Sequence, residues 1–352
     1  MIVVARRFLI ILTLLAGIHL ILQFYSTYPV TKKHRKMRSN WKILRKLIVD
    51  SENSTQKLPV TELQFKGRWD NHLNKKDLIL YHFDLGIEKN KLLCPILPSN
   101  LGPVVEDKDI MNLYGLDDMV LHVQPGGIYA PLDCISRQKI GIIAVVHETH
   151  IQVRNFIGSF LYYMHPFLMK QQIEYQIFIV VKANAIPPFK RGELYNIGFE
   201  AAQTYYNKNW DCVIFHDIYM VPLDTRNLYR CSRRPKKLID FGKRSMFGGV
   251  VAMKPAQFVL VNGFSNLAWS RNDDYEDMYK RLIAANCTIE ANKSPIANYT
   301  TIDYLKQMNN ESLQSPTVAP GYLKDGLSNL PSNISEIVFR EFYTLVEVNI
   351  ET

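Results

Sequence analysis

The first 46 residues of this 352-residue chain contain no acidic side chain. Ten of the 42 lysines and arginines lie in that segment, so the rest of the chain carries 32 basic residues against 33 acidic ones. The net charge of +9 is therefore a property of the N-terminal segment, because the body of the chain has a formal charge of −1. A body without excess positive charge is not expected to bind nucleic acid, since phosphate backbones are recognised by basic patches.

Cysteine is also scarce, and no two of the five cysteines form a CxxC pair. Structural zinc sites are usually built from such pairs, so the spacing argues against zinc. In an oxidising compartment five cysteines would give two disulfides and one free thiol, whereas buried unpaired thiols are the alternative. Composition alone is compatible with both. The cysteines are Cys94, Cys134, Cys212, Cys231 and Cys287.

An uncharged apolar run spans residues 8–25 and follows Arg6 and Arg7. Its length is close to the roughly 17–25 residues that a membrane-spanning helix needs. A cleaved signal peptide is the alternative, but the run is long for one and no small-x-small cleavage site follows it cleanly. We therefore predict an uncleaved anchor at residues 8–25, with residues 1–7 as a short cytoplasmic tail.

Two patterns give opposite orientations for this anchor. The basic residues Lys32 to Arg38 favour a cytoplasmic body by the positive-inside rule. Six N-glycosylation sequons all lie C-terminal of the run and favour a lumenal body, although Pro295 weakens the third. They begin at Asn53, Asn286, Asn292, Asn298, Asn310 and Asn333. We expect a single-pass type II protein whose C-terminal domain is lumenal.

Residues 26–91 are basic and polar without sustained periodicity, which is typical of a stem, and residues 92–350 are predicted to form a compact domain. Within the domain, apolar runs of strand length alternate with amphipathic stretches of helix length. This succession predicts an α/β fold with a parallel sheet that places ligands at the carboxyl ends of its strands. The expected strands are 140–146, 175–181 and 210–219, and the expected helices are 155–172, interrupted or kinked at Pro166, and 192–206.

The second half of the domain has weaker signals. A glycine-rich strand is expected at 247–253, and a helix from Pro255 should end at Asn262-Gly263. A polar cluster, 272–277, precedes an expected helix through 278–285. The alternating stretch 342–350 predicts a half-buried edge strand.

Two groups of carboxylates are candidates for chemistry. Asp217 ends the third expected strand, where a carboxylate can contact a ribose, a metal ion or a sugar hydroxyl, although a turn or helix cap is the commoner role. Asp273, Asp274, Glu276 and Asp277 lie close together before the next helix. They could simply complement the helix dipole, or bind sugar hydroxyls with one of them acting as a general base.

Eight ordered motifs carry a resemblance to a known family. They are GGIYAPLDC (126–134), YYMHPFLMKQQIEYQIFIV (162–180), FKRGELYNIGF (189–199), WDCVIFHD (210–217), NLYRC (227–231), FGGV (247–250), NGFSN (262–266) and DGLSNL (325–330). In this order and spacing they resemble the β-1,4-galactosyltransferase family over about residues 92–350. The resemblance implies a GT-A type fold with a mainly parallel central sheet, a Golgi membrane anchor, a UDP-sugar donor, a glycan acceptor and Mn²⁺. It also implies the disulfides Cys94–Cys134 and Cys212–Cys231, with Cys287 unpaired.

Carried over residue by residue, the resemblance assigns nucleotide-sugar binding to Phe189, Arg191, Asp217 and Gly249. The family's acidic motif aligns with residues 269–277, so the general-base position holds Tyr275. Asp274, Glu276 and Asp277 remain as catalytic candidates beside it.

The metal ligands are not retained in this alignment. The family's D-V-D matches Asp217-Ile218-Tyr219, and its M-x-x-H matches residues 301–304, so Tyr219, Thr301 and Tyr304 stand at the three ligand positions. We therefore predict no metal site from these residues; Lys190 or Arg271 could replace the metal's charge.

Two functions follow from these substitutions. The first is transfer of a hexose, galactose or N-acetylgalactosamine, from a UDP-sugar to a glycoprotein or glycolipid glycan in the Golgi. The second is a catalytically inactive family member that binds a glycan or modulates an active glycosyltransferase partner.

Overall fold

The computed structural model describes residues 56–58, 91–104, 122–146, 150–182, 190–205, 210–242, 244–268, 271–301, 321–331 and 334–348. All of them belong to one compact unit, residues 47–352. The predicted tail, the predicted anchor at 8–25 and nearly all of the predicted stem lie outside the described residues. Among the helices that are described, none is long and apolar enough to cross a membrane.

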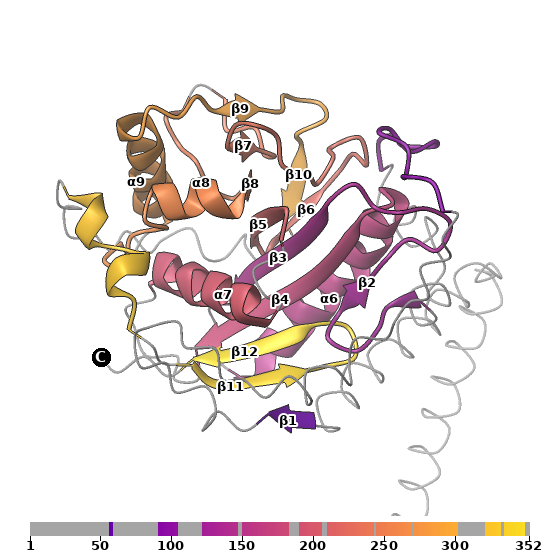
Figure 1. The fold of residues 1–352 in the computed structure, drawn as a ribbon, viewed down its shortest axis with the longest axis horizontal. Coiled ribbons are helices and arrows are strands. Elements are labelled where there is room, and N and C mark those ends of the chain that lie inside the picture. Colours follow the sequence, from indigo (N-terminus) through magenta and orange to yellow (C-terminus); the bar gives the residue numbers. More distant parts are fainter. Residues whose placement is uncertain are drawn as a thin grey trace, which may run out of the picture. The chain divides into compact units, whose positions relative to one another are not determined.

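The described residues form a ten-stranded mixed sheet with a parallel centre (Figure 1). Its four central strands are parallel and lie in the order β12 (Thr344–Val348), β4 (Glu174–Lys182), β3 (Lys139–Val146) and β5 (Cys212–Asp217). Beyond β5 follow β8 (Val250–Met253), β7 (Lys236–Lys237) and β9 (Glu290–Ala291). Beyond β12 follow β11 (Ile334–Phe339) and β1 (Gln56–Leu58), and β2 (Ile128–Tyr129) pairs with β4. This arrangement confirms the predicted α/β fold with a mainly parallel central sheet.

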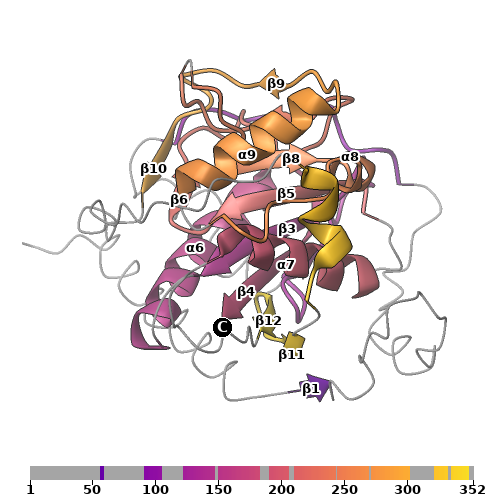
Figure 2. The same cartoon turned by 90° about the vertical axis from the view of Figure 1, so that its left-hand side faces the viewer.

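Helices α6 (His150–Lys170) and α7 (Arg191–Tyr205) cover opposite faces of this sheet (Figure 2). Side chains alternate between the faces, so Ile143 and Val145 of β3 join the core under α7, while Phe160 of α6 meets His216 on the other face. Burial on both faces explains why the central strands are continuous apolar runs. Of the two effects expected of Pro166, interruption does not occur, because α6 continues past it to Lys170.

Two other expectations need correction. Helix α9 (Arg271–Ala284) begins seven residues before the expected helix, so the acidic cluster lies inside it rather than ahead of it. Strand β12 has the expected alternating burial but is internal, because it pairs with both β11 and β4. The short helix α8 (Pro255–Leu260) does start at the predicted proline, and Gly263 ends it with a φ of 70°.

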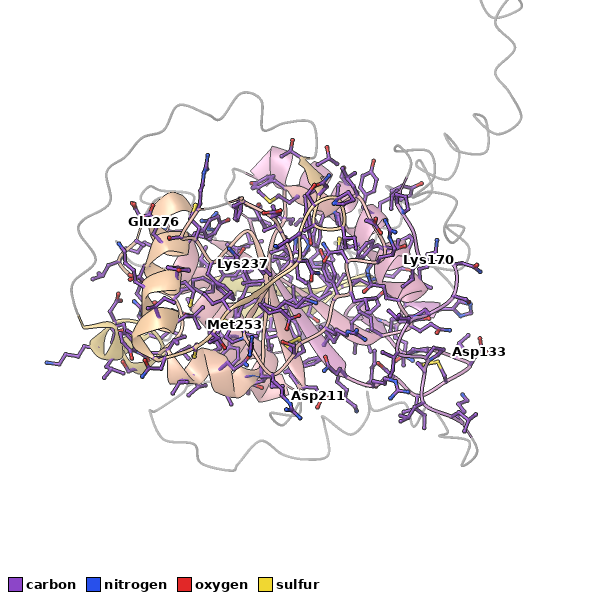
Figure 3. All side chains as sticks on the ribbon, turned by 90° about the horizontal axis from the view of Figure 1, so that it is seen from above. Asp133, Lys170, Asp211, Lys237, Met253 and Glu276 are labelled. Carbon is purple, nitrogen blue, oxygen red and sulfur yellow. A yellow bond between two sulfur atoms is a disulfide. The ribbon has the colours of Figure 1, made fainter. Side chains whose placement is uncertain are left out.

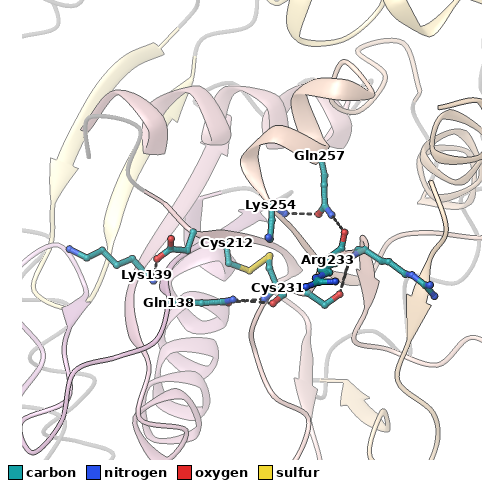
Figure 4. Close-up of a disulfide and its surroundings, with 10 residues drawn as sticks. Gln138, Lys139, Cys212, Cys231, Arg233, Lys254 and Gln257 are labelled. Carbon is teal, nitrogen blue, oxygen red and sulfur yellow. Dashed lines mark hydrogen bonds between the residues drawn. A yellow bond between two sulfur atoms is a disulfide. The ribbon is translucent and has the colours of Figure 1, made fainter. Parts of the chain in front are cut away.

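Both disulfides are confirmed. Cys94 is bonded to Cys134 and Cys212 to Cys231, and Cys287 is free. Figure 4 shows the second bond, which joins the start of β5 to the segment before β7. The Gln138 amide accepts from the Cys231 N–H and donates to its carbonyl, at 2.9 and 3.0 Å. The covalent bond and this amide pair fix the beginning of β5, and therefore also the position of its carboxyl end.

Two of the motifs that carry the family resemblance pack against each other. In the first, NGFSN, the Asn266 N–H donates to the Asp325 carboxylate of DGLSNL, and the Ser265 hydroxyl donates to the other oxygen. Arg281 of α9 binds the same carboxylate at 3.1 Å. The Asn196 amide of α7 reaches this cluster through Asn266, at 2.8 Å. These motifs are therefore framework residues that hold the 321–330 segment against α7 and α9.

Candidate functional site

A buried cluster of charged side chains lies at the carboxyl end of β5. Arg191, the first residue of α7, contacts Asp274 of α9 through both Nε and Nη2, at 2.9 and 2.8 Å from Oδ2. Its Nη1 lies 3.8 Å from Oδ2 of Asp217, the last residue of β5. Three elements that are far apart in the sequence therefore meet where parallel sheets place their ligands.

Tyr275 completes the cluster. Its ring lies 4.5 Å below the Arg191 guanidinium carbon and stacks on Phe241, and it packs against Gly248. A Cβ added at Gly248 would come within 1.8 Å of the Tyr275 Cδ1, so glycine is required there. The residue at the expected general-base position is therefore an aromatic packing element with a cation–π contact to Arg191.

Burial sets the electrostatics of this cluster. Burial raises the pKa of Asp274 to about 6, and the opposing effect of Arg191 only partly offsets it. For Arg191 itself burial lowers the pKa, but Tyr275 and Asp274 outweigh burial and raise it, so the guanidinium stays charged. Asp274 Oδ1 is buried and has no hydrogen-bond partner among the residues that the structure describes. One carboxylate oxygen is thus held by Arg191 while the other is left to accept a proton.

The structure separates the three carboxylates that the sequence grouped as catalytic candidates. Within α9, Glu276 faces away from Asp274 and Asp277, because helical positions one or two residues apart do not share a face. Glu276 is exposed and pairs only loosely with Lys280, at 4.0 Å (Figure 3). Asp277 binds Arg281 and belongs to the framework described above. Of the three, Asp274 alone contacts the Arg191 cluster in the described part of the chain.

Of the three positions expected to bind Mn²⁺, the two that the structure describes do not fit that ion. Tyr219 is buried, and Thr301 lies on β10 (Tyr299–Thr301), paired in register opposite Met220 of β6 (Met220–Pro222). The two positions are therefore neighbours, but they offer a phenol and a hydroxyl where a hard cation prefers carboxylate oxygen. Tyr304 lies outside the described residues. Among those described, no group of three or more His, Cys, Asp or Glu could hold a metal.

The remaining predicted donor-site residues are placed as follows. Gly249 has a φ of 70°, and its carbonyl accepts from the Asp217 N–H at 2.8 Å, so it positions the end of β5. Phe189 lies outside the described residues. Arg191 and Asp217 are brought together, as described above.

A second set of residues supports β5 from the α6 side and was missed by the sequence reasoning. His216 Nδ1–H donates to the backbone carbonyl oxygen of Asp217 at 2.9 Å, and Nε2 lies 2.8 Å from the Tyr229 hydroxyl. Tyr229 in turn lies 3.1 Å from the Tyr299 hydroxyl on β10. Burial lowers the pKa of His216 to about 4, so the imidazole is neutral. The only sequence signal was the polar His216 inside an apolar strand.

Comparison with known proteins concerns the family and the fold of this chain. Residues 94–232 match the profile described as the N-terminal region of glycosyl transferase group 7, and residues 232–304 match the N-terminal domain of galactosyltransferase. β-1,4-Galactosyltransferase 1 of Mus musculus is 30% identical over 269 residues, which is 72% of this chain and 66% of the relative. β-1,4-Galactosyltransferase 2 of Cricetulus griseus is 30% identical over 274 residues, 73% of this chain and 72% of the relative.

The alignments span 60 to 66% of the length of the mouse, cattle and human β-1,4-galactosyltransferase 1 sequences. A solved structure of a mutant Drosophila β-1,4-galactosyltransferase 7, in complex with manganese, UDP-Gal and xylobiose, superposes with a TM-score of 0.51 and 18% identity. It covers 61% of this chain and 95% of that chain, and it supports the GT-A-like fold. By its sequence profiles and its relatives, this chain belongs to the β-1,4-galactosyltransferase family.

Proposed function

We propose that this protein is a glycosyltransferase that moves a hexose from a UDP-sugar to a hydroxyl of a glycan. Asp274 acts as the general base of this reaction, one position before the residue that aligns with the family's base. The protein works as a single-pass type II protein of the Golgi membrane, with its C-terminal domain in the lumen. The family relationship and the presence of six sequons C-terminal of the apolar run support this placement.

The observation that carries the proposal is the geometry of the Asp274 carboxylate. Arg191 fixes Oδ2 at 2.8 Å, while Oδ1 is buried without a hydrogen-bond partner among the described residues. A base is most effective when its pKa lies near the working pH, and burial raises the pKa of Asp274 to about 6. The cluster also lies at the carboxyl edge of the parallel strands, where nucleotides bind in open α/β sheets.

The reaction is a single displacement in this scheme. The acceptor oxygen forms a bond to C1 of the hexose, and the bond between C1 and the diphosphate oxygen breaks with its electron pair remaining on UDP. The proton of the acceptor hydroxyl moves to Asp274 Oδ1. The Drosophila enzyme with UDP-Gal and xylobiose supports a UDP-sugar donor and a glycan acceptor for this chain.

One observation favours the second candidate, a catalytically inactive family member that binds a glycan or modulates an active glycosyltransferase. Tyr275, at the family's base position, is buried under Arg191 and packed on Gly248, where it cannot serve as a carboxylate. In that case the Arg191–Asp274 pair would only stabilise the fold. The two candidates therefore differ in what Asp274 does.

The test is transfer by the full-length protein purified in detergent. Radiolabelled UDP-galactose and UDP-N-acetylgalactosamine are offered with glycan acceptors ending in N-acetylglucosamine, glucose or xylose. We expect transfer, and we expect Asp274→Asn to lower kcat by about 10²- to 10⁴-fold, the usual contribution of a general base. Glu276→Gln makes the same chemical change two positions along α9 on an exposed side chain, and it should leave kcat unchanged.

Retained UDP-sugar binding without transfer to any acceptor would favour the inactive family member. Equal losses in Asp274→Asn and Glu276→Gln would remove the assigned role of Asp274. The orientation is tested separately by glycosidase treatment of the protein made in animal cells. A lumenal domain is supported if glycosidase treatment changes the electrophoretic mobility of the protein and if replacing the sequon asparagines removes this change. It is contradicted if the mobility does not change and a C-terminal epitope tag is accessible from the cytosol.

A further inference from the structure

We infer that the donor site of this protein works without a divalent cation, and that the Arg191 guanidinium supplies fixed positive charge for the UDP diphosphate. The inference rests on the proposed function, because it concerns the same donor. Three observations carry it: the surroundings of Asp217, the pairing of β6 with β10, and the position of Arg191.

The Asp217 carboxylate is turned toward groups of the protein itself. The backbone N–H of Tyr219 donates to Oδ1 at 3.1 Å, and Oδ2 lies 3.8 Å from Arg191 Nη1. The side chain is only 3% exposed. A carboxylate held by a backbone N–H on one side and by a guanidinium on the other already has its negative charge compensated without a metal.

The register of the small sheet places the two substituted ligand positions that the structure describes close together. Thr301 is paired with Met220, the residue after Tyr219, so both substituted positions lie at the same place in the fold. Each contributes a neutral oxygen, and the Tyr219 side chain is buried. One carboxylate with a neutral phenol and a neutral hydroxyl is a poor set for a hard cation.

Arg191 has a position that suits an anion, and its Nη1 can donate a hydrogen bond in addition to its ion pair with Asp217. It is the first residue of the 15-residue helix α7, whose N-terminus carries a partial positive charge. The Arg191 side chain is 7% exposed, and Nη1 has no hydrogen-bond partner among the residues described, although Nε and Nη2 hold Asp274. Lys190 precedes it and adds a second cation at this helix end. A buried guanidinium at a helix N-terminus can stabilise the departing diphosphate electrostatically.

The first experiment measures binding to the full-length protein in detergent. Calorimetric titration with UDP is done in chelator and again with excess Mn²⁺, and Mn²⁺ alone is titrated by electron paramagnetic resonance. We expect the UDP affinity to be the same in both conditions and no binding of Mn²⁺ alone. An increase in UDP affinity of about tenfold or more with Mn²⁺, equal to ~1.4 kcal/mol, would overturn the inference.

A matched pair of variants sharpens the result. Tyr219→Asp restores a carboxylate beside Asp217 and should introduce an Mn²⁺-dependent increase in UDP affinity, whereas Tyr219→Phe removes only the hydroxyl and should behave like the parent. If the parent responds to Mn²⁺ and Tyr219→Phe loses the response, the phenol is a ligand and the inference fails. Arg191→Gln should weaken UDP binding in chelator by about 10- to 100-fold, the value of a hydrogen bond to a charged group. Unchanged affinity in that variant would remove the role of Arg191.

The outcomes also separate this inference from the proposed function. UDP binding in chelator without any transfer supports the metal-independent site and contradicts the transferase. Transfer that requires Mn²⁺ supports the transferase and contradicts the metal-independent site. Absence of UDP binding in every condition contradicts both.

Discussion

Replacing Arg191 and Asp274 by neutral residues, singly and together, tests how much their buried ion pair contributes to the free energy of unfolding. The contact distances are 2.8 and 2.9 Å, and the two side chains are 7% and 2% exposed. Removing one partner of such a pair leaves an uncompensated buried charge, which typically costs about 3–5 kcal/mol. Arg191→Gln should therefore be strongly destabilising, because Asp274 and Asp217 would both lose the cation that contacts them.

The double variant Arg191→Gln/Asp274→Asn removes both charges and should recover most of this loss. A coupling free energy of about 2–3 kcal/mol between the two sites is expected from contacting charged residues. In thermal unfolding of the full-length protein, each kcal/mol should correspond to less than the ~2–4 °C in Tm that is typical of about 150–250 residues, because the chain is longer. Glu276→Gln on the exposed side of α9 should change Tm very little, by less than about 0.5 kcal/mol in free energy.

The loss of stability caused by Arg191→Gln should depend on pH. The pKa of Asp274 in the folded protein is about 6, above its ordinary value. Burial of Asp274 therefore costs no stability below the ordinary pKa, where the carboxyl is protonated in both states. The cost grows as the pH rises from the ordinary pKa through 6. Arg191 lowers the pKa of Asp274, so Arg191→Gln should raise that pKa further above 6. The destabilisation caused by Arg191→Gln should therefore shrink as the pH is lowered toward 6, because Asp274 of the variant takes up a proton before Asp274 of the parent does. Equal Tm values for the single and the double variant at neutral pH would refute the reasoning, since they would mean that Asp274 carries no charge there.

Three more predictions follow from the same structure. Transfer by the parent should rise with pH and level off above about 6, and Asp274→Asn should abolish this dependence in a pH–rate profile; a profile that falls through pH 6 would contradict a base with the Asp274 pKa. Gly248→Ala should cost about 1–3 kcal/mol by overpacking against the Tyr275 ring, measured by chemical denaturation, and Tyr275→Ala should relieve the added cost. Replacing Cys212 and Cys231 by serine should lower stability by about 2–4 kcal/mol in the same assay, whereas Cys287→Ser should not, because Cys287 forms no disulfide.

The central sheet could be predicted from sequence because its signal is local and strong. Strands β3, β4 and β5 are continuous apolar runs buried on both faces, and each of the first two is followed by a helix of sufficient length. Chain order and the handedness of crossovers then leave few topologies for β3, β4 and β5. The position of β12 was not predictable in the same way, since alternating burial reveals a half-buried strand but not which strands flank it.

The start of α9 was misplaced for a physical reason. Asp273 and Asp274 lie in its first turn, where acidic side chains complement the helix dipole, yet a run of polar residues also suits a loop. This error mattered for the site. A loop could have directed Asp274, Glu276 and Asp277 to one place, whereas a helix sends them to Arg191, to solvent and to Arg281.

The Arg191–Asp274 contact joins residues 83 positions apart, and no local pattern indicates it. The family resemblance pointed to both residues but not to their pairing, because it placed the base at Tyr275. Phe241, which stacks on Tyr275, carried no sequence signal at all. The site therefore needed the fold before its residues could be given roles.

Tyr275 and Tyr219 both stand where the family has an acid, and both lower the negative charge of this site. A carboxylate at position 275 would be a third acid beside Asp217 and Asp274, with Arg191 as the cation that contacts both of them. A divalent ion could balance such a set, but a lone guanidinium could not, and buried uncompensated carboxylates are costly. Tyr275 instead offers Arg191 the face of an aromatic ring, at 4.5 Å, without adding a charge. Tyr219 likewise replaces an acid and leaves its backbone N–H on Asp217. The loss of the metal ligand and the loss of the acid at the base position thus act in the same direction, because each removes a negative charge from a site where Arg191 contacts two carboxylates.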